Sequence, residues 1–176
     1  MPILTIPDPS LVVLIGAAGS GKSTFAARHF HPSEILSSDA FRALIAGDEG
    51  DQTATRAAFG RLHRELARRL ADGGLTVVDA TNVERSARRA LIARARSAGL
   101  PAVAIVLDLP AATVLARNAA RTGRMVDEIV VRRHLDRLRH AVDGSGAWLH
   151  VEGFSQVVIL QDPLEFEAVI IVRQSG

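Results

Sequence analysis

With 176 residues, 48% of them hydrophobic and 23% charged, the chain has the length and composition of one soluble globular domain that can bury a core. Cysteine is absent, which excludes disulfides and thiolate metal sites and suits a cytoplasmic protein. The net charge is only +2, no apolar run could span a membrane, and the first ten residues, MPILTIPDPS, do not resemble a signal peptide. We therefore expect a single cytoplasmic domain over residues 1–176, with no membrane partner.

Short apolar segments alternate with longer amphipathic ones along the chain. The apolar segments predict buried strands at 11–16, 34–38, 75–80, 102–109 and 156–160. Helices are predicted at 22–30, 53–72, 84–98, 111–121 and 127–142. Residues 143–148 are interpreted as a loop, and the tail PLEFEAVIIVRQ fits either a helix or a strand. This alternation predicts an α/β fold with a five-stranded, mainly parallel sheet flanked by helices, and ligands bound at the carboxyl ends of its strands.

The segment GAAGSGKS at 16–23 matches the phosphate-loop pattern G-x-x-x-x-G-K-[ST], follows a predicted strand and opens a predicted helix. Its glycines allow backbone amides to turn inward, and the helix N-terminus favours an anion. Lys22 would reach the β- and γ-phosphates, and the Ser23 hydroxyl would bind Mg²⁺ or Mn²⁺. The motif predicts binding of ATP or another nucleoside triphosphate, and leaves the reaction open. We assign the nucleotide contacts to Gly16, Gly19, Ser20, Gly21, Lys22, Ser23 and Thr24.

Asp39 and Arg42, in LSSDAFR, lie where the second strand passes into a helix. Asp39 as the N-cap would explain the aspartate. It would leave Arg42 at the third helical position, where a capping box has Glu or Gln and a cation is unfavourable by roughly 0.3–1 kcal/mol. An acceptor that carries a phosphate accounts for both residues: Arg42 binds the phosphate, and Asp39 accepts the proton of the attacking hydroxyl.

Asp79 ends the third predicted strand, in VVDATN. At that place its carboxylate could hold a metal-bound water or orient a substrate. The alternative is that Asp79, Thr81 or Asn82 caps the helix that begins near residue 84, and Asn82 fits this role. We place Asp79 and Asn82 among the acceptor-binding candidates.

Three arginines follow the fourth predicted strand, in ARNAARTGRMV. Arg117, Arg121 and Arg124 share one face if the helix continues that far, with Gly123 as its expected end. Like charges so close repel one another unless an anion joins them. We predict an arginine-rich lid, at about 111–126, that neutralises the donor phosphates during transfer. A solvated basic surface is the alternative.

Arginine is concentrated in one part of the chain. Residues 84–139 contain twelve arginines and five acids, whereas Lys22 is the only lysine in the sequence. This imbalance fits a polyanionic partner and, equally, a solvated surface. His63, His134 and His140 fit polar helix faces and show no metal-binding spacing. Trp148 fits packing better than stacking on a base, and without tyrosine we expect no stacking surface for single strands.

Taken together, these motifs resemble the bacterial polynucleotide 5′-kinase module of RNA end-healing and sealing enzymes. The resemblance extends over nearly the whole chain and is carried by GSGKSTFA, SSDAFR, DQTATRAAF, LTVVDATNVERSARR and RNAARTGR. It implies a P-loop phosphotransferase core with a lid, several nucleoside triphosphates as donors, and phosphatase and ligase partners for end sealing.

The resemblance also implies a role for each matching residue. Lys22 and Ser23 would serve the phosphates and Mg²⁺, and Asp39 would be the general base. Arg42 would contact the phosphate beside the acceptor's 5′-hydroxyl. The lid residues that would bind the donor phosphates are Arg117, Arg121 and Arg124.

Three functions remain open at this point. The first is transfer of the γ-phosphate to the 5′-hydroxyl of RNA or DNA. The second is a P-loop kinase for a small molecule, such as a sugar, an antibiotic or a nucleotide-sugar. The third is a non-catalytic switch that binds a nucleoside triphosphate. The apolar tail AVIIV would allow a homodimer.

Overall fold

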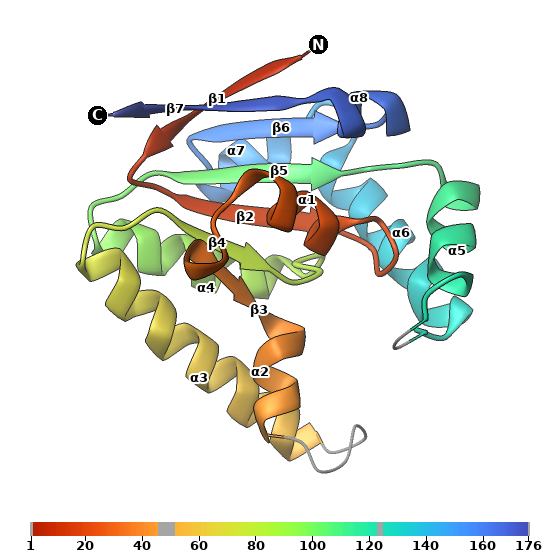
Figure 1. Cartoon of the computed structure of the whole chain (residues 1–176), viewed down its shortest axis with the longest axis horizontal. Helices are drawn as coiled ribbons and strands as arrows, with labels where there is room; N and C mark the ends of the chain where they lie inside the picture. The colour runs from red at the N-terminus through yellow and green to blue at the C-terminus, as the bar shows by residue number, and fades with distance from the viewer. Residues whose placement is uncertain (1, 46–51, 123–124, 176) are drawn as a thin grey trace.

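The computed structural model describes residues 2–45, 52–122 and 125–175, and the side chains of these residues except 42–45 and 52–55. Its centre is a five-stranded sheet in the order β3–β4–β2–β5–β6, in which all neighbouring strands are parallel (Figure 1). The prediction of a parallel α/β sheet is therefore confirmed. The strands are β2 (Leu11–Gly16), β3 (Ile35–Ser37), β4 (Thr76–Asp79), β5 (Ala102–Leu107) and β6 (Gln156–Leu160).

Helices connect the strands and cover both faces of the sheet. They are α1 (Lys22–His29), α2 (Ser38–Ile45), α3 (Gln52–Ala71), α4 (Arg85–Ser97), α5 (Ala111–Ala119), α6 (Glu128–Val142), α7 (Ala147–Glu152) and α8 (Pro163–Ala168), with a 3-10 turn at Pro32–Glu34. Among the described helices, none is both long and apolar enough to cross a lipid bilayer.

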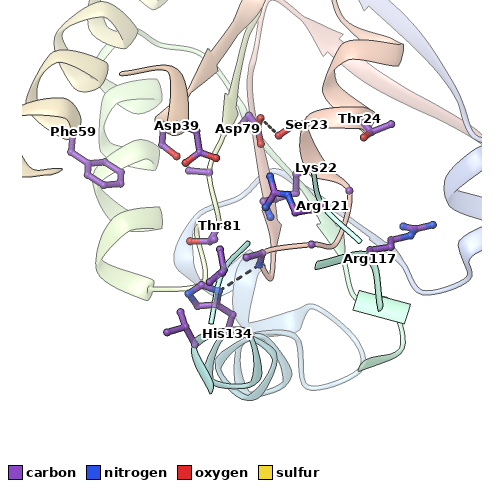
Figure 2. Close-up of a pocket in the computed structure, with 17 residues that line it drawn as sticks. Lys22, Ser23, Thr24, Asp39, Phe59, Asp79, Thr81, Arg117, Arg121 and His134 are labelled. Carbon is purple, nitrogen blue, oxygen red and sulfur yellow. Dashed lines mark hydrogen bonds between the residues drawn. The ribbon is translucent and has the colours of Figure 1, made fainter. Parts of the chain in front are cut away.

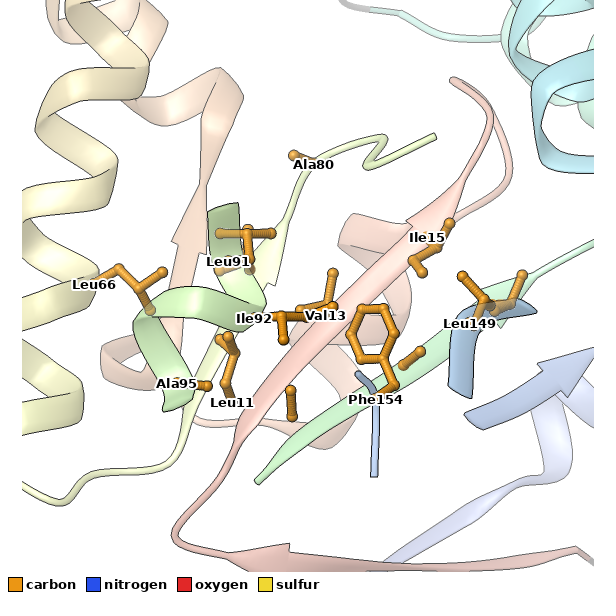
Figure 3. Packing of buried hydrophobic residues seen from close by; sticks show 14 of the residues in the cluster. Leu11, Val13, Ile15, Leu66, Ala80, Leu91, Ile92, Ala95, Leu149 and Phe154 are labelled. Carbon is orange, nitrogen blue, oxygen red and sulfur yellow. The ribbon is translucent and has the colours of Figure 1, made fainter. Parts of the chain in front are cut away.

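The core lies on the two faces of β2, which is buried along its whole length. Because successive side chains of a strand point to opposite faces, Leu11, Val13 and Ile15 pack against one set of helices and the residues between them against another. Figure 3 shows the first set, to which α3, α4 and α7 contribute residues such as Leu66, Ile92 and Leu149. Helices α1 and α8 cover the opposite face, so the sheet is buried on both sides.

A second, two-stranded sheet joins the ends of the described chain. Strand β1 (Ile3–Asp8) pairs in parallel with β7 (Ile170–Ser175), and Leu4 and Ile6 close the core over α1 and α8. The tail is thus helix α8 followed by strand β7, which resolves the ambiguity in its pattern. In AVIIV, Val169 is buried whereas Ile170 and Val172 are exposed, and the homodimer stays a prediction.

Two predicted boundaries were wrong. Residues 143–148 are not all loop, because α7 begins at Ala147 and runs for six residues, too few for a clear helical pattern. Helix α5 ends at Ala119, so Arg121 lies beyond the helix that carries Arg117. Near that end, the Asn118 side-chain amide donates to the Val126 carbonyl oxygen at 2.7 Å and its oxygen accepts from the Val126 amide at 3.2 Å, which brings residues 118 and 126 together.

Candidate active site

A pocket of about 480 Å³ opens at the carboxyl ends of β2, β3 and β4, where parallel α/β sheets bind their ligands (Figure 2). Segments far apart in sequence meet there: the phosphate loop at 16–23, the start of α2, the middle of α3, the end of β4 and the α5–α6 connection. The lining includes Ala18, Gly19, Gly21, Lys22, Ser23, Thr24, Ser38, Asp39, Phe59, Asp79, Thr81, Arg117, Arg121, Val130 and His134.

The phosphate loop has the backbone that its glycines predict. Gly19 has a φ of +84° and Gly21 a φ of +96°, both in the left-handed region. A Cβ on Gly19 would also lie 2.8 Å from the carbonyl oxygen of Val114 on α5. Glycine is therefore required at 19 for close packing as well as for conformation. Gly21 precedes α1, so the helix N-terminus faces the pocket.

Lys22 lies at the base of the pocket and is almost fully buried. Its ammonium donates hydrogen bonds to the carbonyl oxygens of Gly16 at 3.0 Å and Ala17 at 2.8 Å. Burial lowers the pKa of Lys22 to about 8; the charges of Asp79 and Asp39 oppose this, and Arg121 adds to it. Three ionisable side chains thus act on the same ammonium across one pocket.

Ser23 and Asp79 form a direct pair beside Lys22. The Ser23 hydroxyl donates to Oδ2 of Asp79 at 2.7 Å. Burial raises the pKa of the Asp79 carboxyl above its usual value, while the Ser23 hydrogen bond and the Lys22 charge oppose that shift. A hydroxyl and a carboxylate at the foot of a phosphate loop match the donor set that Mg²⁺ takes together with substrate phosphates. Elsewhere, the described residues bring no three His, Asp or Glu side chains together for a metal.

Asp39 faces the pocket from α2, on the opposite side from the phosphate loop (Figure 2). It is not the helix cap, so that alternative was wrong. Helix α2 begins at Ser38, and the Ser37 hydroxyl accepts the Ala40 amide hydrogen bond at 3.4 Å. Asp39 is therefore the second helical residue.

The earlier start of α2 moves Arg42 to the fifth helical position. The field of the helix terminus falls off within the first turn, so the dipole argument for a phosphate beside Arg42 loses its force. The Arg42 side chain and the whole of Arg124 lie outside the described residues. Their predicted roles rest on the sequence alone.

The two described lid arginines occupy different places. Arg121 extends toward Lys22 at the centre of the pocket, and its charge acts on both Lys22 and Asp79 (Figure 2). Arg117 lies against the outer side of the loop: Nη1 donates to the Ser20 carbonyl oxygen at 3.4 Å, and its guanidinium carbon is 5.4 Å from the centre of the Phe166 ring. Both arginines line the pocket although no common helix carries them.

Asn82 takes a different place from the one we assigned to it. It does not cap α4, whose N-cap is Glu84, and it is absent from the pocket lining. Its buried amide donates to the carbonyl oxygen of Leu14 at 2.7 Å and of Ala80 at 3.3 Å. Asn82, with a φ of 49°, thus ties the turn after β4 to β2, which helps to hold Asp79 in place.

Sequence reasoning missed two residues of the pocket. His134 was placed on a polar helix face, yet its Nδ1 accepts the Ala18 amide of the phosphate loop at 3.5 Å. Phe59 was grouped with the apolar stripe of its helix, yet it is partly exposed and lies beside Asp39 (Figure 2). A helical pattern in a sequence shows which residues share a face of the helix. It cannot show that one turn of that helix reaches a pocket.

Comparison with known proteins gives one family match. The model of an AAA domain matches residues 11–144. None of the curated proteins with which the sequence was compared matches it.

Several solved structures resemble the chain. One chain of an RNA repair complex, Pnkp1/Rnl/Hen1, is 22% identical with a TM-score of 0.68, over 79% of this chain and 47% of that chain. The present chain thus spans about half the length of that relative. A sugar kinase from Janibacter sp. HTCC2649 is 20% identical with a TM-score of 0.59, over 90% of both chains. A gluconokinase from Sinorhizobium meliloti 1021 is 21% identical with a TM-score of 0.54, over 90% of this chain and 87% of that one. Identities this low show the shared fold, which is that of P-loop kinases.

Proposed function

The chain belongs to the AAA domain family, and we propose that it is a kinase that transfers the γ-phosphate of ATP, or of another nucleoside triphosphate, to the 5′-hydroxyl end of RNA or DNA. One observation carries the proposal. Asp39 faces the same pocket as Lys22, Ser23 and Asp79 from the other side, so a carboxylate stands opposite the phosphate loop. A protein that only binds the nucleotide has no need of a carboxylate in that place, whereas transfer of the γ-phosphate uses one to orient the attacking hydroxyl and receive its proton.

The donor side of the pocket would bind the triphosphate. Backbone amides of the phosphate loop and the N-terminus of α1 face the phosphates, and Lys22 and Arg121 would neutralise their charge. Ser23 and Asp79 would hold Mg²⁺, which supplies charge neutralisation at the phosphate oxygens when bound. Arg117, on the outer side of the loop, would contact the donor beyond the phosphates that Lys22 reaches.

The acceptor side would be formed by α2 and α3. The hydroxyl oxygen of the acceptor would attack the γ-phosphorus. The bond from that phosphorus to the bridging oxygen of the β-phosphate would break, and ADP would leave. Asp39 would orient the hydroxyl and accept its proton, and Phe59 would pack beside the acceptor. Arg42 and Arg124 enter this proposal from the sequence resemblance alone.

The choice of a polynucleotide rests on the motifs of the polynucleotide 5′-kinase module. The structural likeness to a chain of an RNA repair complex supports a test with RNA, although the fold alone does not select an acceptor. By the same reasoning, phosphatase and ligase partners are proposed for any role in end sealing. The excess of arginine between residues 84 and 139 agrees with a polyanionic acceptor.

A small-molecule kinase is the second candidate, and one observation favours it. The sugar kinase and the gluconokinase resemble this chain over nearly the whole length of both proteins. An acceptor of that kind would fill the space between Asp39 and Phe59 and would need no further binding surface.

Radiolabelled ATP with Mg²⁺ separates the candidates. The chain would be offered a 5′-hydroxyl RNA 12-mer, the same 12-mer with a 5′-phosphate, a nucleoside 3′-phosphate, and sugars including gluconate. Label on the 5′-hydroxyl 12-mer and none on the 5′-phosphorylated one is expected. Label on a sugar with none on any nucleic acid would reject the proposal in favour of the second candidate. ATP turnover that none of the acceptors stimulates would favour the third function, a nucleotide-binding switch.

Arg42 has a separate test. Arg42→Ala should raise the KM for a nucleoside 3′-phosphate more than the KM for ATP, because the arginine is proposed to bind that phosphate. Equal acceptor kinetics in the altered and unaltered chains would exclude this contact.

A further inference from the structure

A second pocket, of about 430 Å³, lies among α4, α6 and α7. Its lining combines a tryptophan with basic side chains, Arg85, Arg137 and His140. Trp148, the only tryptophan of the sequence, lies in the first turn of α7 and is 58% exposed, whereas tryptophan is highly buried on average. The expectation that Trp148 serves packing was therefore wrong, and its ring is available to a ligand.

Two segments of the chain contribute residues to both pockets. On α6, Val130 and His134 line the first pocket and Arg137 lines the second. The helical rise places Arg137 about 4.5 Å further along the axis than His134. After β4, Thr81 lines the first pocket and Arg85 the second. A linear ligand that enters the first pocket could thus extend directly into the second.

The floor of the second pocket is rigid. Arg88 is buried and donates two hydrogen bonds of 2.7 Å to Glu152 of α7, which joins α4 to α7 beneath the ligand-facing surface. Because Arg88 is fully engaged, it contributes little to recognition. It joins the helix that carries Arg85 to the helix that carries Trp148.

The rim can bind phosphate. Arg85 and Arg137 have side chains that are 66% and 47% exposed, with Glu152 3.8 Å from Arg85 and Glu84 paired to Arg137. The Arg137–Glu84 pair is exposed on both sides and therefore weak, so a phosphate oxygen can replace the carboxylate at Arg137. Glu152 is buried, and a phosphate at Arg85 would bind the exposed part of that guanidinium beside it. An exposed aromatic ring between cationic side chains is the arrangement with which proteins bind single-stranded nucleic acid.

We propose that this second pocket binds the nucleotides that follow the 5′-terminal one in a single-stranded acceptor, with one base stacked on Trp148 and phosphates bound by Arg85 and Arg137. The inference rests on the proposed function, because it extends the acceptor beyond the nucleotide that faces Asp39. It predicts that acceptor length matters: a 12-mer uses both pockets, and a nucleoside 3′-phosphate uses only the first.

Trp148 is the only tryptophan, so intrinsic fluorescence reports on this pocket alone. A 5′-hydroxyl RNA 12-mer should quench that fluorescence in a saturable manner, and a nucleoside 3′-phosphate should not. Arg137→Ala should weaken the binding and lower the slope of log affinity against log salt by about one unit, as expected for one lost phosphate contact. Arg139→Ala is the matched control, since Arg139 is exposed on the same helix and pairs with Asp136.

Kinetics provide the second measurement. Trp148→Ala should raise the KM for the 12-mer about tenfold, from the loss of one stacked base, and leave the KM for the nucleoside 3′-phosphate unchanged. Trp148→Phe should restore part of the affinity. Val151→Ala, which alters an exposed residue of the same helix outside the pocket, should have no effect.

The outcomes separate the two proposals. Transfer to the 12-mer without quenching, and with equal KM in Trp148→Ala, would overturn this inference and leave the kinase assignment standing. Saturable quenching without transfer to any acceptor would support the pocket and reject the kinase. If the 12-mer does not quench, and Trp148→Ala converts a dimer to a monomer in sedimentation, the surface is a contact between copies of the chain and the inference fails.

Discussion

The hydroxyl of Ser23 donates a 2.7 Å hydrogen bond to Oδ2 of Asp79, and this contact joins residues that are 56 positions apart. Ser23 lies in the first turn of the helix after the phosphate loop, and Asp79 ends a neighbouring parallel strand. The sheet therefore delivers a buried carboxylate to the place where the nucleotide's metal would sit. The sequence suggested either residue separately, and only the fold shows them as one unit.

The Ser23–Asp79 pair predicts the metal dependence of nucleotide binding. Asp79→Asn should weaken the effect of Mg²⁺ on ATP affinity about 10- to 100-fold, because the amide keeps the shape of the side chain and loses its charge. Calorimetric titration with ATP, in Mg²⁺ and in EDTA, measures this. The affinity in EDTA serves as the control and should change little. An unaltered Mg²⁺ effect in Asp79→Asn would remove Asp79 from the metal site.

Asp39→Asn tests the proposed general base. Transfer to the acceptor should fall about 10²- to 10⁴-fold, the range typical of general-base catalysis, while ATP affinity is retained. Single-turnover transfer with saturating ATP and acceptor separates the chemical step from binding. Asp72→Asn, which alters an exposed carboxylate distant from the pocket, is the matched control. Full activity in Asp39→Asn would assign the proton to another acceptor.

Lys22 predicts how nucleotide binding depends on pH. Its pKa of about 8 means that the free protein loses the ammonium charge as pH rises through that value, whereas bound phosphate would favour the charged form. ATP affinity should therefore fall above pH 8, and binding near pH 8.5 should take up protons. Calorimetry in two buffers of different ionisation enthalpy counts those protons. Lys22→Arg, which stays charged, should abolish the uptake; if uptake persists, another group titrates.

The same shift has a consequence for stability in the absence of nucleotide. In the folded protein the pKa of Lys22 lies below its ordinary value of 10.5, so the unfolded chain binds more protons between about pH 8 and 10.5. Stability rises with pH wherever the unfolded state binds more protons. Deprotonation of Lys22 therefore raises the free energy of unfolding as the pH rises from about 8 to 10.5. Over the same pH range it lowers the affinity for ATP.

His134 is predicted to support the phosphate loop. Its Nδ1 accepts the Ala18 amide, and burial together with the charges of Lys22 and Arg133 lowers the pKa of His134 below 6.5. The ring is thus neutral, and able to accept, at neutral pH. His134→Ala should weaken ATP binding about 2- to 10-fold, from the loss of a hydrogen bond that contributes ~0.5–1.5 kcal/mol.

Lowering the pH should weaken ATP binding in the same way as His134→Ala. A protonated His134 cannot accept the Ala18 amide, so ATP affinity of the unaltered chain should decline once the pH falls below 6.5, and that decline should be reduced in His134→Ala. Identical pH profiles for the two proteins would show that the hydrogen bond does not influence the loop.

The buried pair of Arg88 and Glu152 predicts a large effect on stability. Arg88 donates to both oxygens of Glu152 and to the carbonyl oxygens of Asn82 and Val83. Arg88→Leu should cost about 3–5 kcal/mol in urea unfolding, because it leaves the buried Glu152 carboxylate with only the exposed Arg85, 3.8 Å away, as an ionic partner. Arg88→Leu with Glu152→Leu should recover part of that loss. A double variant no more stable than Arg88→Leu would show that the carbonyl contacts, rather than the charge pair, dominate.

Much of the fold could be predicted from local patterns. A strand buried on both faces must be apolar along its length, so β2, β4 and β5 were visible as apolar runs, as was the partly buried edge strand β6. The phosphate loop was equally clear, because phosphate binding demands glycines, a lysine and a hydroxyl at consecutive places. These features depend on neighbours in the chain.

The remainder depends on residues far away in sequence. Strand β1 escaped prediction because its partner, β7, lies at the other end of the chain. Asn82 looked like a helix cap until the fold placed its amide against Leu14. His134 had an ordinary position in a predicted helix and Trp148 in a predicted loop, and only packing decided that one reaches the phosphate loop and the other stays exposed.

By itself, then, the sequence determined the parallel α/β sheet and the loop that binds a phosphate, since both need only a local order of residues. The tertiary structure decided which side chains share the pocket with that loop, and that an exposed tryptophan and basic side chains line a second pocket. Burial and proximity are properties of the packed chain, because each residue's environment is supplied by elements that the sequence places tens of residues away.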